Sequence, residues 1–238
     1  MCLNKIRQHQ RSAYAEPFHP RAKQSAKSLR TLRKNFAYFA LKKHVPKIQY
    51  LCKKKMQSKL FCLESVPDVT SQTSSIILPS LEKLALQYNI TNVYQTCDSI
   101  EGLEESLGTL LYEDRNFRDY EIIYLVFKGR DNNIIIDNYL YSLEEIAEFF
   151  EGKLTNKRIH FANTLQLDLD SETAQYFLDV TGAISISGYR NPAPILSTII
   201  DNPFFGLCQE YDEATDIVEE LFEKHYTLAK AMGLTLYY

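Results

Sequence analysis

The sequence has no tryptophan, and it has only eight glycines and three methionines among its 238 residues. The glycines are scattered, and neither G-x-G-x-x-G nor G-x-x-x-x-G-K-[ST] occurs. The zinc-protease pattern H-E-x-x-H and the hydrolase pattern G-x-S-x-G are also missing. These absences disfavour a phosphate-binding glycine loop, a zinc-protease centre and an α/β-hydrolase nucleophile. We therefore expect neither a cofactor nor a metal.

Long apolar runs are absent too, because no stretch of 18 or more apolar residues occurs. We therefore expect no transmembrane segment. The first residues lack the apolar core of a secretory signal. The cysteines are odd in number and lack C-x-x-C spacing, which disfavours a disulfide scaffold or a zinc ribbon. We expect a cytoplasmic protein with reduced thiols, and we expect three of its five cysteines to be small core residues: Cys62, Cys97 and Cys208.

The net charge of −3 conceals a division of the chain. Residues 1–59 carry 16 Lys/Arg and one acid, whereas residues 60–238 carry 11 Lys/Arg and 29 Asp/Glu, so the two parts have net charges of +15 and −18. This asymmetry predicts a basic extension over residues 1–56 and one domain over residues 57–238. Met56 lies where the charge changes sign, so the chain begins naturally at either Met1 or Met56.

The basic extension has little patterning, and it is expected to be partly helical or disordered. Residues 21–43 have apolar positions at the 3.6-residue period of an amphipathic helix. Such a helix is suited to nucleic-acid phosphates, to an anionic membrane surface, or to the acidic remainder of the same chain. A disordered tail is the fourth interpretation, since blocks of like charge tend to be disordered.

From residue 59 onward, short apolar runs alternate with segments of helical period. This alternation predicts an α/β domain with a mainly parallel central sheet flanked by helices. Asp137-Asn138 predicts a hairpin turn, Ser142 and Glu145 have the spacing of a capping box, and Ser171 is suited to cap a helix. Strands are predicted at residues 60–63, 92–97, 121–127, 134–136, 139–141, 157–162 and 183–187, and helices at 76–88, 100–112, 143–150, 172–180, 195–200 and 211–232. Residues 234–238 are either a last strand or an apolar tail.

Five segments follow one another in the order found in CHAT-type, caspase-like domains. They are the run over residues 122–129, the hairpin at 134–136, the segment 141–147, the strand 159–162 and the segment 181–188. Residues 56–189 resemble, more closely, a family of small bacterial proteins of unknown function with that fold. The resemblance implies a caspase-like fold for the domain, and the basic extension lies outside it.

In caspase-like proteases, a His-Gly pair follows the third strand and a cysteine nucleophile follows the fourth. The resemblance places Lys128, before Gly129, at the histidine position, and it places Thr164 at or beside the cysteine position. Both catalytic residues are therefore missing. The first hypothesis is a catalytically degenerate module that binds or regulates another protein. The alternative is a hydrolase with a rewired site around Lys128, Thr164 and Asp131, in which lysine is the base and threonine the nucleophile.

Other polar residues near the expected strand ends are candidates for a ligand-binding site. Ligands of parallel sheets lie at the carboxyl ends of the strands. An anion bound between Arg130 and Arg190 is one interpretation, and two separate surface charges is the other. The possible pocket rim is Gly129, Arg130, Asn163, Gln166 and Arg190.

Two further candidates have a structural interpretation that we favour. Asp168, Asp170 and Glu172 alternate, which suits a divalent cation, although an acidic helix N-terminus explains them more simply. His160 lies within a predicted strand, so its side chain is expected to point to a face of the sheet and to be half-buried. Neither candidate is therefore assigned a catalytic role.

Overall fold

The computed structural model describes residues 58–69, 75, 77–164, 167–192 and 197–238. The basic extension predicted from the sequence lies outside the described residues. All described residues belong to one compact unit, Cys52–Tyr238. Its fold is α/β, as the sequence predicts.

The described residues form eight strands and six α-helices. The strands are β1 (Lys59–Ser65), β2 (Thr91–Cys97), β3 (Tyr120–Arg130), β4 (Asn133–Ile136), β5 (Tyr139–Ser142), β6 (Arg158–Thr164), β7 (Ser185–Tyr189) and β8 (Leu234–Tyr237). The α-helices are α1 (Leu78–Tyr88), α2 (Ile100–Gly108), α3 (Leu143–Phe149), α4 (Ser171–Thr181), α5 (Thr198–Glu210) and α6 (Ala214–Met232). A π-helical turn (Thr109–Glu113) extends α2, and a 3₁₀ turn (Phe117–Asp119) precedes β3.

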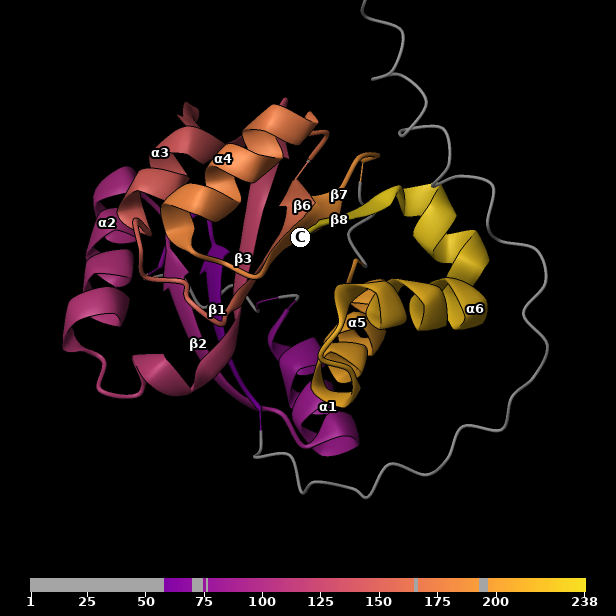
Figure 1. The fold of residues 1–238 in the computed structure, drawn as a ribbon. Coiled ribbons are helices and arrows are strands. Elements are labelled where there is room, and N and C mark those ends of the chain that lie inside the picture. The colour runs from indigo at the N-terminus through magenta and orange to yellow at the C-terminus, as the bar shows by residue number, and fades with distance from the viewer. Residues whose placement is uncertain (1–57, 70–74, 76, 165–166, 193–196) are drawn as a thin grey trace, which may run out of the picture. The chain divides into compact units, whose positions relative to one another are not determined.

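The main sheet has the strand order β2-β1-β3-β6-β7-β8. The first five of these strands are parallel, and β8 pairs antiparallel with β7 at one edge. The hairpin β4–β5 extends the end of β3. Figure 1 shows α2, α3 and α4 on one face of the sheet and α1, α5 and α6 on the other. The architecture is therefore a three-layer sandwich around a mostly parallel mixed sheet.

The central strand β3 shows why the sheet has a core on both faces. Its run from Ile122 to Phe127 is buried at every position. Alternate residues contribute to different cores: Ile123 and Leu125 pack with α2, α3 and α4, whereas Ile122 and Tyr124 pack with α1, α5 and α6. Two-sided burial is the reason that a parallel strand reads as a continuous apolar run rather than as an alternation.

Local signals in the sequence correctly placed the hairpin and α3. Asp137 and Asn138 have φ values of 45° and 63°, the left-handed backbone that a tight two-residue hairpin turn needs. Ser142 accepts a hydrogen bond from the backbone N–H of Glu145, and the Glu145 carboxylate accepts one from the backbone N–H of Ser142. The predicted capping box is thereby confirmed.

Three predictions about the C-terminal part need correction or completion. The short helix predicted over residues 195–200 is instead α5, which continues through Pro203 to Glu210. Phe204, Phe205 and Cys208 are buried there, so packing outweighs the helix-breaking tendency of the proline. Asp170, rather than Ser171, caps α4. The apolar C-terminal residues form strand β8 rather than a tail.

Two helical glycines are expected to respond oppositely to the same substitution. A Cβ added to Gly206 in α5 would lie 2.3 Å from the ring of Tyr88, whereas nothing lies within 4 Å of a Cβ at Gly108 in α2. Gly206→Ala should therefore destabilise the protein by about 1–3 kcal/mol through overpacking. Gly108→Ala should stabilise it by about 0.5–1 kcal/mol through helix propensity. Urea denaturation of both variants measures these effects. A stabilised Gly206→Ala variant would contradict the close packing of Gly206 against the ring of Tyr88.

Candidate functional site

The two positions singled out by the caspase-like resemblance lie side by side at the carboxyl end of the sheet. Lys128 and Gly129 stand near the end of β3, and Thr164 is the last residue of the neighbouring strand β6. Gly129 is the register partner of Thr164, after an irregularity that begins at Val126. The pairing of β3 with β6 thus brings together positions that are 35 and 36 residues apart in the sequence.

Lys128, near the end of β3, is exposed to solvent. Its side chain faces solvent, and its ammonium group has no hydrogen-bond or ion-pair partner among the residues that the structure describes. Gly129 is buried beside it. The side chains of Asn163 and Thr164, and Gln166 as a whole, lie outside the described part of the chain. A lysine becomes a base through burial, so exposed Lys128 lacks the surroundings for that role.

The two arginines at these strand ends each have a carboxylate of their own. Arg190 Nε lies 2.8 Å from Asp168 Oδ1, and Arg130 Nε lies 3.6 Å from Asp131 Oδ2. Both pairs are exposed, so they contribute little to stability. The arrangement agrees with the interpretation of two separate surface charges rather than a shared anion.

The alternating carboxylates of the β6–α4 connection have structural partners. Asp170 caps α4 by accepting a hydrogen bond of 2.7 Å from the backbone N–H of Thr173, which confirms the acidic helix N-terminus. Asp168 pairs with Arg190, and its backbone N–H donates to Asn132 Oδ1 at 3.0 Å. Among the described residues, no group of three or more histidine, cysteine or acidic side chains lies in a metal-binding arrangement.

A second polar constellation, which the sequence analysis missed, lies inside the core between the sheet and α5. His160 of β6 stands at its centre and is fully buried. Its Nδ1 lies 2.8 Å from Ser187 Oγ of β7, and its Nε2 lies 3.0 Å from Asp201 Oδ1 of α5. His160 does point to a face of the sheet as predicted, but it is fully rather than half-buried.

Asp201 is the acceptor around which this constellation, the Asp201 network, is organised. Tyr124 Oη donates to Oδ2 at 2.6 Å, and Ser197 Oγ donates to the same oxygen at 2.9 Å. Tyr189 Oη donates to Oδ1, the oxygen that also faces His160. Burial by itself raises the pKa of Asp201, but the hydrogen bonds and the charge of His160 outweigh it, so the net pKa is lowered. The carboxylate is therefore held in its ionised form.

The Asp201 network has the residue types of a Ser-His-Asp triad but not its accessibility. With Asp201 ionised, His160 Nε2–H donates to it. Ser187 Oγ is the hydrogen-bond partner of His160 Nδ1, and the Ser187 hydroxyl also donates to the backbone carbonyl of Ile159 at 3.3 Å. Ser187 is only 1 % exposed, and both His160 and Asp201 are 0 % exposed. A serine nucleophile must reach its substrate, so the network is suited to fastening α5 onto β3, β6 and β7 rather than to chemistry.

The sequence did contain a signal for the Asp201 network. Tyr124 lies within the apolar run 122–127 of β3, and His160 lies between the apolar residues Ile159 and Phe161 of β6. Ser187 and Tyr189 alternate in the next strand. Polar atoms on buried faces need partners, so several such positions on adjacent strands predict a shared acceptor. The acceptor itself was missed because Asp201 precedes Asn202-Pro203, a combination typical of a loop.

The three described cysteines are buried and form no disulfide with one another, as expected for core residues. Burial raises the pKa of Cys62 well above its usual value, and it raises the pKa of Cys97 to about 12. Raised pKa values keep both thiols protonated, which is the opposite of what a cysteine nucleophile requires.

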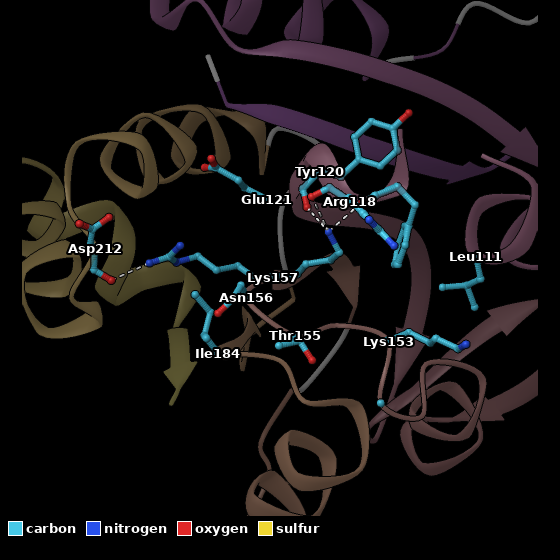
Figure 2. A pocket seen from close by; sticks show the side chains of 13 residues that line it. Leu111, Arg118, Tyr120, Glu121, Lys153, Thr155, Asn156, Lys157, Ile184 and Asp212 are labelled. Carbon is cyan, nitrogen blue, oxygen red and sulfur yellow. Dashed lines mark hydrogen bonds between the residues drawn. The ribbon is translucent and has the colours of Figure 1, made fainter. Parts of the chain in front are cut away.

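A cavity of about 870 Å³ lies at the amino end of the sheet, opposite the strand ends discussed above (Figure 2). It is bounded by the starts of β3 and β6, by the segment that precedes β6, and by Ile184 before β7. None of the rim residues expected from the sequence lines it. The cavity was not foreseen because its residues come from five separate stretches of sequence.

Fold and site together define an α/β protein with a mostly parallel mixed sheet and polar strand ends. Residues 57–238 match a family of unknown function (DUF6642), and the chain belongs to that family. No curated protein matches the chain. Within the described residues, none of the helices has the length and apolar character needed to cross a membrane.

Replacing the central carboxylate should test the Asp201 network. Asp201→Asn keeps the side-chain volume but removes the charge that holds His160 and three hydroxyls, so we expect a loss of about 3–5 kcal/mol in unfolding free energy. Because the folded-state pKa of Asp201 is lowered, its stabilisation is present above the unfolded pKa of about 3.9 and is lost as the pH falls through the folded value.

The difference in unfolding free energy between wild type and Asp201→Asn should therefore be largest at neutral pH and should shrink below about pH 4. Denaturation at several pH values measures it. Asp179→Asn is the matched control, because Asp179 is exposed on α4 and should change stability by less than about 0.5 kcal/mol. Equal effects of the two substitutions would contradict the role of the network.

Proposed function

We propose that the chain is a CHAT-type, caspase-like module without proteolytic activity that acts by binding another protein. The observation that carries this proposal is the register pair Gly129–Thr164. It joins the ends of the third strand and of the next strand in the main sheet, where the resemblance expects His-Gly and the cysteine nucleophile. The chain has Lys128 and Thr164 at these matched positions.

The chemistry of these residues favours binding over hydrolysis. An acyl-transfer site needs a nucleophile and a base within hydrogen-bond reach, and the base must have a tuned affinity for the proton. Lys128 is exposed, and Asp131 is occupied by its ion pair with Arg130. The competing proposal, a hydrolase that uses Lys128, Thr164 and Asp131, rests only on the closeness of the two strand ends.

The hairpin beside Lys128 offers a surface for a partner. Lys128 pairs with Ile135, and Ile135 pairs with Leu140, so the three residues form one cross-strand row. Lys128 and Leu140 are exposed and Ile135 is half-buried, whereas the next row, Gly129 and its neighbours across the hairpin, is buried. The outward row therefore combines apolar surface with an ammonium that no described residue pairs with.

The outer edge of β5 completes this surface. Among the described strands, β5 pairs only with β4, so one edge of its backbone is available for another strand. Tyr139 and Leu140 on β5 are 49 % and 42 % exposed. We therefore assign the partner as an extended protein segment that adds to β5, with an apolar side chain on Leu140. Lys128, on β3, adds a positive potential across the same face that favours an acidic segment.

The absence of proteolysis can be tested directly. Wild-type protein incubated with fluorescently labelled casein should release no more peptide than buffer does, because the matched positions lack an activated nucleophile. Thr164→Ala and the exposed control Thr227→Ala should behave in the same way. Cleavage by wild type that is lost in Thr164→Ala and retained in Thr227→Ala would replace the binding proposal with the hydrolase.

The binding surface can be tested with arrayed short peptides that alternate apolar and acidic residues. Fluorescence anisotropy should show saturable binding of the selected peptides. Leu140→Asp and Lys128→Glu should each weaken that affinity at least about tenfold, equivalent to about 1.4 kcal/mol. Leu86→Asp is the matched control, since Leu86 is 89 % exposed on α1. Unchanged affinity in Leu140→Asp, or equal losses in both leucine variants, would contradict the assigned surface.

A further inference from the structure

The cavity at the amino end of the sheet concentrates positive charge within an acidic part of the chain. Residues 60–238 carry only 11 Lys/Arg against 29 Asp/Glu. Four of those 11 cations line this one cavity, together with only two acids, Glu121 and Asp212. They are Arg118, Lys153, Lys157 and Arg158. A local excess of cations in an acidic unit favours an anionic occupant.

Two of these cations are buried in the wall and are held by neutral carbonyl oxygens. Lys157 Nζ donates to the carbonyls of Phe117 at 2.8 Å and Tyr120 at 2.7 Å, as Figure 2 shows. Arg158 donates to the backbone carbonyl of Asp212 at 2.7 Å. Neither cation forms a salt bridge with a described carboxylate. Carbonyls satisfy hydrogen bonds without cancelling charge, so both residues contribute positive potential to the cavity.

The burial of Lys157 in the cavity wall affects its pKa. Burial lowers its pKa, and the charges of Asp119 and Glu121 compensate only in part. A bound anion would favour the protonated form of Lys157. The nearby carboxylates thus leave part of the positive charge of Lys157 uncompensated.

The other two cations are exposed and are placed to touch a ligand. The guanidinium of Arg118 has no hydrogen-bond or ion-pair partner among the described residues. Lys153 lies over the ring of Tyr112, with 5.0 Å between Nζ and the ring centroid, and its ammonium remains exposed. The guanidinium of Arg118 can bind a phosphate or carboxylate through two parallel hydrogen bonds, while Lys153 supplies a second charge.

The cavity also has apolar surface and the size of a small-molecule site. Leu111 and Ile184 line it, and Ile184 is 41 % exposed. Its volume of about 870 Å³ falls within the usual range of about 300–1,000 Å³ for ligand sites. Figure 2 shows Leu111 and Ile184 on opposite sides of Lys157. An apolar group can therefore accompany the anion.

We infer that this cavity binds a small molecule that carries an oxyanion, either phosphate or carboxylate, next to an apolar group. Arg118 and Lys153 contact the oxyanion, Lys157 and Arg158 supply the positive field behind it, and Leu111 and Ile184 receive the apolar part. The site lies at the end of the sheet opposite Lys128, so it is independent of the partner surface on β5.

Calorimetric titration of the full chain tests this site with three probes that share a phenyl ring. Phenyl phosphate or phenylacetate should bind with a Kd below about 1 mM at low salt, and the affinity should fall as salt rises. The tighter of the two identifies the source of the oxyanion as phosphate or carboxylate. Benzyl alcohol, which has no charge, should bind at least about tenfold more weakly because the cations gain nothing from it.

Substitutions of the residues that line the cavity test whether the anion binds there. Arg118→Gln should weaken the preferred anion at least about tenfold, and Lys153→Gln should weaken it by about threefold to tenfold. Arg115→Gln is the matched control, because Arg115 is exposed nearby but does not line the cavity. Circular dichroism checks that each variant is folded. No saturable binding of either anion, equal binding of benzyl alcohol, or equal losses in Arg115→Gln and Arg118→Gln would overturn the inference.

Discussion

The buried carboxylate of Asp201 is the constraint on which the positions of three strands and one helix depend. It accepts hydrogen bonds from β3, β6 and β7 and from Ser197 just before α5. Removing a charge from water costs several kcal/mol, and the cost is offset only when every donor is in place. The strands and α5 are therefore mutually dependent: a shift of any one of them leaves an ionised group unsatisfied in the core. The Asp201 network therefore also fixes the relative positions of the carboxyl ends of β3, β6 and β7.

Charged side chains are paired in different ways at the two ends of the sheet, and this difference supports the separate roles that we propose for them. At the carboxyl end, Arg130 and Arg190 are each neutralised by a neighbouring aspartate, and Lys128 alone has no described partner. At the amino end, buried cations are held by carbonyl oxygens, which leave their charge intact. The first arrangement suits the mixed surface of a protein partner, and the second suits a small anion.

Local patterns predicted most of the fold, because its strands and helices follow from short-range rules. The apolar run of β3, the hairpin turn at Asp137 and the capping box at Ser142 depend only on neighbouring residues, and all three are confirmed. The extent of α5 was not predictable in this way, since burial of Phe204 and its neighbours overrides Pro203. The Asp201 network and the amino-end cavity were missed for a related reason. Both join residues that are distant in sequence, and only the strand order brings them together.

The location of the histidine supports the proposal that the strand ends bind a partner rather than cleave it. A protease of this kind needs its base beside the nucleophile, at the solvent-facing end of the sheet. The described residues contain two histidines, His160 and His225, and His225 lies in α6. His160 precedes Thr164 by four residues on β6, which places it about 13 Å back along the strand, within the core. The polarised His–Asp pair thus stabilises the interior, while the accessible strand end presents an ammonium and an apolar row. Such a surface can recognise a partner, but it has no described group that would draw a proton from a nucleophile.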